Sequence, residues 1–153
     1  MNLHIRQATQ DDLSQVLALY AQPDMDDGDV LLLPEAVAIF EQFQRYPNYR
    51  LFVACEGGKG GEQGPVLGTY ALLIMHMLAH RGTPAAVVED VVVDQAHRSQ
   101  GVGALMMDHA KSLAQEAGCY KLALSSNQKR ERAHAFYESL GFERHGYSFL
   151  IEI

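Results

Sequence analysis

The spacing of apolar residues in the first third of the chain predicts a strand followed by two helices. Residues 3–6 alternate between apolar and polar side chains, which is typical of a half-buried strand. Thr9 is a favoured residue at a helix start, and the apolar side of the helix expected after it comprises Leu13, Val16, Leu17 and Tyr20. Because proline is favoured in the first turn of a helix, Pro34 predicts a second helix, from Pro34 to Tyr46.

Three strands are expected in the middle of the chain, over residues 51–55, 66–77 and 85–93. A glycine-rich stretch, residues 56–65, separates the first two and is typical of a flexible hairpin connection. The third run consists almost entirely of β-branched and small residues, a pattern of strands that are covered on both faces. We therefore expect it to be the central strand of a sheet.

The last part of the chain predicts a helix, a strand, a second helix and a hairpin. The first of these helices is expected to begin near Gly101 and to end at Gly118, and its apolar side comprises Val102, Leu105, Met106, Ala110, Leu113 and Ala117. A strand is expected over residues 120–125, a short helix over residues 131–140 and a hairpin over residues 142–153. A strand–helix–strand connection is parallel and right-handed, so the fold class is mixed α/β: a mostly antiparallel central sheet with one parallel strand pair, flanked by helices.

The composition describes one soluble globular domain over residues 1–153. The chain has a net charge of −7, and 48% of its residues are hydrophobic. Binding to nucleic acid calls for clustered basic charge and insertion into a membrane calls for a long apolar run, so neither partner is expected. The two cysteines, Cys55 and Cys119, are too few for a disulfide framework and favour a reducing cytoplasm.

Two other features invite a metal-ion interpretation. His76 and His80 lie four residues apart without an acidic or cysteine residue at ligand spacing, which favours ordinary polar histidines, and we expect no metal. In the acidic segment 24–29, the glycine comes one place too early for a calcium-binding loop, although Glu35 falls where such a loop has its last ligand. A solvated loop or the rim of an acceptor site is therefore favoured over calcium.

The segment from Val91 to Ala104 predicts a site for a phosphate or a pyrophosphate. A strand turns through a loop with two glycines, Gly101 and Gly103, into a helix whose first N–H groups have no acceptor within the helix. Glycines let an oxygen-rich group approach the main chain, and Arg98 can add a side-chain donor. The glycine spacing excludes the dinucleotide fingerprint Gly-x-Gly-x-x-Gly, and the chain contains no Walker loop.

Two motifs, in order along the chain, resemble one known family. Arg98-x-x-Gly101-x-Gly103 resembles the acyl-CoA pyrophosphate motif of the GNAT (Gcn5-related) N-acetyltransferases, and residues 135–142 resemble that family's later motif Phe-Tyr-x-x-x-Gly-Phe. The resemblance implies acetyl-CoA as co-substrate, inserted between two parallel strands that splay apart. The residues that it implies for acetyl-CoA binding are Val91, Val92, Val93, Arg98, Ser99, Gln100, Gly101, Val102, Gly103, Ala104, Asn127 and Tyr137.

Within this family, residues 89–94 and 118–122 resemble the glucosamine-6-phosphate N-acetyltransferase branch. That branch closes with a basic residue that helps to hold the sugar phosphate, whereas this chain ends with the residues Phe-Leu-Ile-Glu-Ile. The resemblance therefore implies a small primary amine as acceptor, such as an amino sugar phosphate or an aminoalkylphosphonate, without naming one compound.

Two carboxylates are candidates for contact with the acceptor. Glu89 and Asp90 interrupt an otherwise apolar run, where an unpaired charge is costly, so we expect them to line a cavity. On strict strand alternation they point to opposite faces of the sheet. Glu89 is the first candidate for the catalytic base or amine-binding group and Asp90 for an acceptor contact, while the alternative role for either is an ion pair with a neighbouring Arg or Lys.

The remaining catalytic candidates follow from the later motif. The resemblance places the hydroxyl of Tyr137 near the sulfur of CoA, where a phenol can donate a proton to the departing thiolate, and Asn127 would hydrogen-bond the pantetheine arm or the acceptor. The alternative for Tyr137 is an ordinary buried tyrosine. A covalent acyl carrier at Cys119 is the rival mechanism, but no His or Asp stands beside it in sequence.

The leading functional hypothesis is therefore an acyl-CoA N-acyltransferase that moves an acetyl group directly from acetyl-CoA to a small amine. Two alternatives stay open: acetylation of a protein lysine or N-terminal amine, and a non-catalytic acyl-CoA-binding module. A homodimer is compatible with each of the three.

Overall fold

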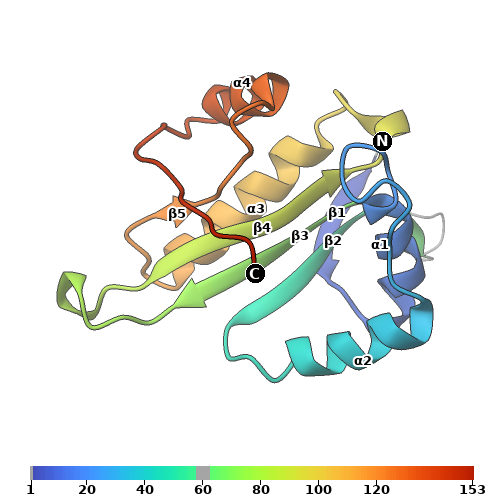
Figure 1. The fold of residues 1–153 in the computed structure, drawn as a ribbon, viewed down its shortest axis with the longest axis horizontal. Coiled ribbons are helices and arrows are strands. Elements are labelled where there is room, and N and C mark those ends of the chain that lie inside the picture. Colours follow the sequence, from blue (N-terminus) through green and yellow to red (C-terminus); the bar gives the residue numbers. More distant parts are fainter. Residues whose placement is uncertain (1, 58–62) are drawn as a thin grey trace. The chain divides into compact units, whose positions relative to one another are not determined.

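One five-stranded sheet organises the chain up to Ala123 (Figure 1). The computed structural model describes residues 2–57 and 63–153, so part of the predicted hairpin connection, residues 58–62, lies outside the described residues. The strands lie side by side in chain order: β1 Leu3–Gln7, β2 Tyr49–Gly57, β3 Gln63–Met75, β4 Ala85–Val93 and β5 Leu122–Ala123.

The strand directions confirm the predicted mixed sheet. The first four strands pair antiparallel, and β5 runs parallel to β4 after the crossover through a helix. The central strand is β3, and not β4 as its continuous β-branched pattern predicts. The reason is that β3 pairs along much of its length with both β2 and β4, whereas β5 is only two residues long and covers little of the other edge of β4.

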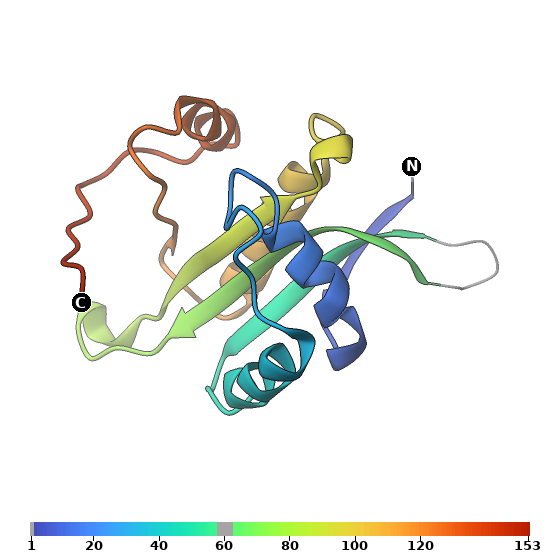
Figure 2. The same cartoon turned by 45° about the vertical axis from the view of Figure 1, so that its right-hand side comes forward.

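Helices cover both faces of this sheet (Figures 1 and 2). One face carries α1 Leu13–Tyr20 and α2 Leu33–Phe43, and the other carries α3 Val102–Glu116. Short 3-10 turns precede or connect these elements: η1 Gln10–Asp12, η3 His80–Gly82 and η4 Gln95–His97. The predicted helix starts near Thr9, Pro34 and Gly101 are thus confirmed, although α2 ends three residues before Tyr46.

The core under α1 and α2 combines the apolar sides of both helices with one face of the sheet. Its buried members are Ala8, Leu13, Val16, Leu19, Ala36, Phe40, Leu51, Val53, Cys55, Val66, Ala71 and Val92. Tyr20, Phe43 and Tyr49 are partly buried against this cluster, and the rings of Phe43 and Tyr49 stack with centroids 4.1 Å apart. This face therefore ends in an aromatic rim at the start of β2.

A buried ion pair ties β1 to the start of α1. The guanidinium of Arg6 donates to both carboxylate oxygens of Asp12 at 2.7 Å, and the side chain of Asp12 is only 5% exposed. The carboxylate also accepts a hydrogen bond from the backbone N–H of Thr9 at 2.8 Å, and this bond caps the start of the helix. The hydrogen bond from Arg6 holds the pKa of Asp12 below its usual value.

The opposite face packs on α3 through a row of small and flexible side chains. Gly68 of β3 permits this close approach, because a Cβ there would lie 3.0 Å from both Met106 Sδ and Val102 Cγ1. The buried side of α3 is the row Val102, Met106, Ala110 and Ala114, with Met107 beside it. The buried side of α3 therefore differs from the predicted apolar side, since Leu105 and Leu113 are only partly buried and Ala117 is exposed. The reason is that residues four apart along the helix form the ridge that packs on the sheet.

Residues from Leu124 to Ile153 form a separate compact unit. Its single helix is α4 Glu131–Ser139, which confirms the predicted helix and its end near Gly141. The predicted hairpin over residues 142–153 is wrong, because these residues form no strand. A strand requires a neighbouring ladder of N–H and C=O groups, and an isolated two-stranded hairpin is marginal in water.

Candidate functional site

The site candidates in the sheet lie along the outer edge of β4. The pairing of β4 with β5 consists of two residue pairs, Ala86 with Leu122 and Val87 with Ala123. From Val88 to Val93, β4 has no pairing with β5 in the described part of the chain. The parallel pair thus separates toward the carboxyl end of β4, as the family resemblance implies, and leaves the backbone of Val91–Val93 on an edge that β5 does not cover.

A β-bulge lies at the point where the two carboxylates occur. Ala71 of β3 pairs with Glu89 and Thr69 pairs with Val92, so two residues of β4, Asp90 and Val91, stand opposite one residue of β3. Asp90 takes a left-handed backbone conformation with φ of +53°. The bulge therefore shifts the alternation of β4 by one residue.

The bulge corrects the prediction that Glu89 and Asp90 point to opposite faces. Glu89 pairs with Ala71, a member of the core cluster under α1 and α2, and so faces the same side. Burial raises the pKa of Tyr49, which packs against that cluster, and the charges of Asp90 and Glu89 add to the shift; burial and the charge of Asp90 likewise raise the pKa of Tyr20 on α1. Both carboxylates therefore act on one face of the sheet, the face covered by α1 and α2.

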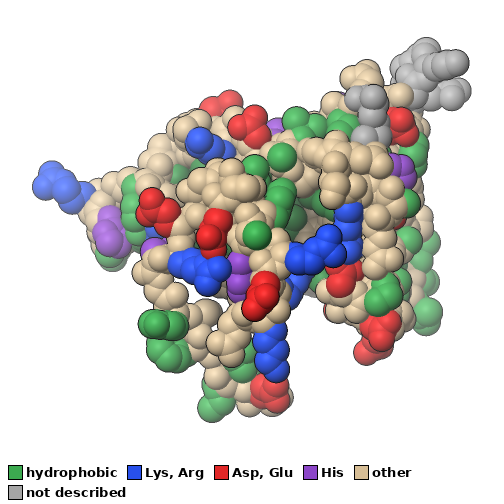
Figure 3. Space-filling model, turned by 90° about the horizontal axis from the view of Figure 1, so that it is seen from above, with side chains coloured by type: hydrophobic (Ala, Val, Ile, Leu, Met, Phe, Trp, Pro, Cys, Tyr) green, Lys and Arg blue, Asp and Glu red, His purple; other side chains and the backbone are tan. Residues whose placement is uncertain are grey.

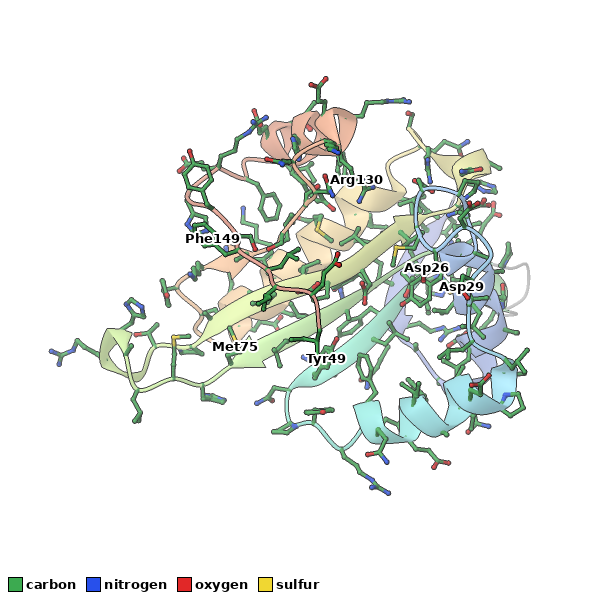
Figure 4. All side chains as sticks on the ribbon, in the orientation of Figure 1. Asp26, Asp29, Tyr49, Met75, Arg130 and Phe149 are labelled. Carbon is green, nitrogen blue, oxygen red and sulfur yellow. The ribbon has the colours of Figure 1, made fainter. Side chains whose placement is uncertain are left out.

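The two carboxylates hold their protons more strongly than ordinary ones. Glu89 and Asp90 are both exposed residues, but partial burial still raises the pKa of Glu89, and the charge of Asp90 adds to the shift. Burial also raises the pKa of Asp90, and here the added charge is that of Asp26 on the loop after α1, which Figure 4 labels. Among the described residues neither carboxylate forms an ion pair with Lys or Arg, so the alternative role of Glu89 and Asp90 as ion-pair partners finds no support.

A pocket of about 300 Å³ opens beside Glu89 and is lined by Tyr46, Tyr49, Leu73, Val87 and Glu89. The rings of Tyr46 and Tyr49 meet edge to face with centroids 6.1 Å apart, and Figure 4 shows Tyr49 at the start of β2. A neighbouring pocket of about 280 Å³ shares both tyrosines but neither carboxylate, so the Glu89 side is the better candidate for amine chemistry. A compact amine would find there an apolar wall, two phenols and one carboxylate.

The turn after β4 is held by its own side chains. Asp94 accepts the backbone N–H of Ala96 at 3.3 Å, and its other oxygen lies 2.7 Å from Nδ1 of His97. Ser99 and Gly101 then take left-handed conformations, with φ of +62° and +88°. A Cβ added at Gly101 would meet nothing within 4 Å, so the space in front of α3 is open.

The start of α3 supplies the backbone donors that the sequence predicts. The first hydrogen bond inside the helix runs from Leu105 N–H to the carbonyl of Gly101, at 3.0 Å. The N–H groups of Val102, Gly103 and Ala104 therefore precede the first intrahelical donor and point out of the helix start. Together with the helix dipole, this arrangement suits an anionic group.

Three contacts to this turn come from residues that sequence reasoning missed or left without a role. Arg98 Nη2 donates to Asp24 at 2.6 Å, and its Nε donates to the carbonyl of Val93 at 3.4 Å. The side chain of Gln22 bonds both Val93 and Gln95. No local pattern predicts the contacts of Gln22 and Asp24, because more than 70 residues separate each of them from its partners in the turn. Only the acidic composition of segment 24–29 draws attention to the loop.

Asn127 and Tyr137 belong to the second unit. The side-chain oxygen of Asn127 accepts the backbone N–H of Lys129 at 2.9 Å, and its backbone carbonyl lies 2.8 Å from Nε2 of His134 on α4. Tyr137 packs edge to face against Phe142, with ring centroids 5.7 Å apart. Burial raises the pKa of Tyr137, so its phenol keeps its proton at neutral pH.

The sheet unit contains the predicted residues of one continuous segment, from β4 to the start of α3: Glu89, Asp90, Val91, Val92, Val93, Arg98, Ser99, Gln100, Gly101, Val102, Gly103 and Ala104. Asn127 and Tyr137 share the second unit, which is described by itself. Tyr20 at the end of α1, Tyr46 between α2 and β2, and Tyr49 at the start of β2 lie near Glu89 or Asp90 only through the fold, which no single segment of sequence reveals.

Other candidate chemistries receive no support from the described residues. Burial raises the pKa of the Cys119 thiol, which disfavours the reactive thiolate that a covalent acyl carrier requires. In residues 2–57 and 63–153 no group of three or more His, Cys, Asp or Glu side chains is arranged to hold a metal ion. No helix within these ranges is both long and apolar enough to cross a membrane.

The face of the molecule drawn in Figure 3 shows Lys and Arg side chains interspersed with Asp and Glu. An anionic ligand that binds on this face would be recognised by nearby hydrogen-bond donors, because the net charge of −7 does not attract an anion at long range.

Comparison with known proteins places these features in a family context. The model of the acetyltransferase (GNAT) family matches residues 13–142. The chain is 39% identical over 83 residues to glucosamine 6-phosphate N-acetyltransferase of Trypanosoma brucei brucei, an alignment that covers 54% of each of the two chains. The chain spans about half the length, or less, of the curated relatives it matches.

Solved structures match over the whole chain. A protein from Agrobacterium tumefaciens str. C58 is 33% identical and has a TM-score of 0.88, with 98% of this chain and 99% of that one covered. Glucosamine-6-phosphate N-acetyltransferase from Arabidopsis thaliana has a TM-score of 0.82 at 21% identity, with 99% of each chain covered. The second likeness concerns the fold alone.

Proposed function

The chain belongs to the acetyltransferase (GNAT) family, and we propose that it transfers the acetyl group of acetyl-CoA directly to the primary amine of a small molecule. The observation that carries the proposal is the arrangement at β4. An uncovered strand edge, a carboxylate of raised pKa that lines a pocket, and an open helix start with Arg98 next to it lie within one unit.

Acetyl-CoA would be held by the edge of β4 and the turn that follows it. The open space at Gly101 and the N–H groups at the start of α3 fit a pyrophosphate, and Arg98 adds a charged donor. Bound acetyl-CoA supplies an activated thioester. The backbone N–H groups of Val91–Val93 would donate to its carbonyl oxygen, where negative charge develops during transfer.

Glu89 is proposed as the catalytic base. A primary amine is largely protonated at neutral pH and must lose a proton before it can attack a thioester. Two observations support Glu89 for this step: it lines the pocket, and its raised pKa makes it a better proton acceptor than an ordinary carboxylate. Asp90, on the same face, would contact the ammonium group of the acceptor before the proton leaves.

Tyr137 is proposed as the acid and Asn127 as a hydrogen-bonding residue for the pantetheine arm or the acceptor. The thiolate leaving group needs a proton, and the raised pKa of Tyr137 keeps its phenol protonated and able to donate one. Support for both roles comes from the match of residues 13–142 to the family model, which includes both positions.

For the acceptor, we propose an amino sugar phosphate or an aminoalkylphosphonate. Support comes from the relative of Trypanosoma brucei brucei, whose name specifies glucosamine 6-phosphate. The proposal also includes a cytoplasmic location, with Cys55 and Cys119 reduced, and compatibility with a homodimer.

A thiol-release assay with acetyl-CoA tests this function. The panel contains glucosamine 6-phosphate, glucosamine, an aminoalkylphosphonate, simple alkylamines, and peptides with a free lysine or N-terminal amine. We expect turnover with phosphorylated or phosphonylated small amines. Turnover of peptides alone would identify a protein acetyltransferase, and binding of acetyl-CoA by calorimetry without turnover of any amine would identify an acyl-CoA-binding module; either result contradicts the proposal.

A further inference from the structure

The side chain of Gln22, just after α1, bridges two backbone groups at the end of β4. Its Nε2 donates to the carbonyl of Val93 at 3.2 Å, and its Oε1 accepts the N–H of Gln95 at 2.7 Å. A carboxamide is suited to this position because it carries a donor and an acceptor on one planar group. The two bonds flank Asp94, so they determine how the chain leaves the strand.

The backbone that follows needs such support. Ser99 and Gly101 both take left-handed conformations, and for a serine this conformation is strained. Strained backbone persists only where surrounding contacts hold it in place. Besides the contacts of the Asp94 side chain within the turn, its beginning is held from outside by Gln22 and by the bond from Asp94 N–H to the carbonyl of Leu67, at 2.8 Å.

A second contact from the same segment holds the side chain of the turn. Asp24, two residues after Gln22, accepts from Arg98 Nη2 at 2.6 Å, while Arg98 Nε reaches the carbonyl of Val93, the same group that Gln22 bonds. Residues 22–24 therefore anchor both the backbone and the arginine of the turn. The Arg98–Asp24 pair is exposed and so contributes little stability of its own, which makes orientation its main effect.

We propose that Gln22 is a positioning residue for the pyrophosphate of acetyl-CoA. This inference rests on the proposed function, since it assigns a role toward the same co-substrate. Gln22 acts through the backbone of Val93 and Gln95: it orders the turn before the ligand arrives, so that less conformational entropy is lost on binding. We expect its effect to fall mainly on ligands that carry the pyrophosphate, because the bond to Gln95 holds the turn that leads to the start of α3, whereas the thioester arm would lie along β4 itself.

The test compares two donors and two variants. Acetyl-pantetheine carries the thioester arm of acetyl-CoA but lacks its phosphates. Gln22→Met removes both hydrogen bonds at similar side-chain length. Gln15→Met is the matched control, because Gln15 also lies on the α1 segment and accepts one long-range backbone hydrogen bond, from Val66 N–H at 2.9 Å, at another strand.

We expect Gln22→Met to raise the Kd of acetyl-CoA by about fivefold to thirtyfold, the equivalent of one or two net hydrogen bonds of about 1 kcal/mol each. The Kd of acetyl-pantetheine should change by about twofold or less, and Gln15→Met should alter neither. In steady-state kinetics KM for acetyl-CoA should rise while kcat and KM for the amine stay at the wild-type values. Calorimetry measures the Kd values, and thermal melting shows that both variants are folded.

Two results would overturn the inference. An unchanged Kd for acetyl-CoA in folded Gln22→Met overturns it, and so does an equal loss for both donors, which would indicate a general structural role. If Gln22→Met does not fold, Gln22→Asn replaces it, since its side chain is one methylene shorter and cannot span both backbone groups. Failure of the wild-type protein to bind acetyl-CoA would instead refute the proposed function.

Discussion

Replacement of Gly101 by alanine separates the backbone requirement of the turn from a role in ligand binding. Gly101 has φ of +88° and no atom within 4 Å of an added Cβ. Alanine there meets no steric clash, so the expected loss of stability is that of the left-handed conformation alone, about 1–2 kcal/mol. For a chain of this size the melting temperature should fall by about 2–8 °C.

Gly118, at the other end of α3, is the matched control. It has φ of +76° and likewise no atom within 4 Å of an added Cβ, so Gly118→Ala should cost about the same stability, 1–2 kcal/mol. Only Gly101→Ala places a methyl group in front of the helix start. We therefore expect its Kd for acetyl-CoA to rise by about tenfold or more, equivalent to one charge-assisted hydrogen bond of about 1.5–3 kcal/mol, while Gly118→Ala binds as the wild type.

The assay is calorimetric titration of both folded variants with acetyl-CoA, accompanied by thermal melts. Equal melting shifts with a selective loss of affinity in Gly101→Ala support a pyrophosphate at this turn. If the two variants bind acetyl-CoA equally well, the pyrophosphate does not approach Gly101, and the cofactor site must lie elsewhere.

Three further substitutions test the remaining roles. Glu89→Gln should leave the affinity for acetyl-CoA unchanged and lower kcat by about 10²-fold or more, most visibly below the pKa of the acceptor amine; turnover at the wild-type level across the pH range would make Glu89 structural. Tyr137→Phe keeps the ring and should lower kcat by about 10²-fold or less, since a thiolate is already a fair leaving group; a full kcat would mean that water protonates the thiolate. His109 of α3 lies 2.6 Å from the hydroxyl of the buried Tyr70, and burial lowers its pKa below 6.5. The folded state therefore binds fewer protons than the unfolded state just below pH 6.5, so the free energy of unfolding should fall as the pH drops through and below that value. Urea denaturation at pH 7.5 and pH 5.5 checks this, and an equal fall in His109→Gln would assign the effect to other groups.

Local patterns were sufficient for most of the elements. The helix starts near Thr9, Pro34 and Gly101 follow from side chains that act on their own backbone, and the structure confirms all three. The phosphate-binding expectation at Arg98-x-x-Gly101-x-Gly103 is of the same kind, because a glycine in a left-handed conformation before a helix is a local feature. Such signals need no knowledge of distant contacts.

The final hairpin shows where a local pattern is insufficient. Residues 142–153 carry the alternation and apolar content of strands, yet they form none. Whether an apolar run becomes a strand depends on a neighbouring edge with unpaired N–H and C=O groups, and no property of the run itself supplies that edge.

The amino-acid sequence by itself determined the order of strands and helices as far as α4, the mixed sheet and the turn at Gly101, because these depend on side-chain periodicity and on backbone preferences of single residues. Only the tertiary structure decided the orientation of Glu89 and Asp90, since the bulge in β4 exists through its register with β3. The same holds for Gln22, whose bonds to Val93 and Gln95 span more than 70 residues and exist only once α1 lies on the sheet. Contacts between residues that lie far apart in the sequence form only when all the elements pack together, so no single segment of the sequence predicts them.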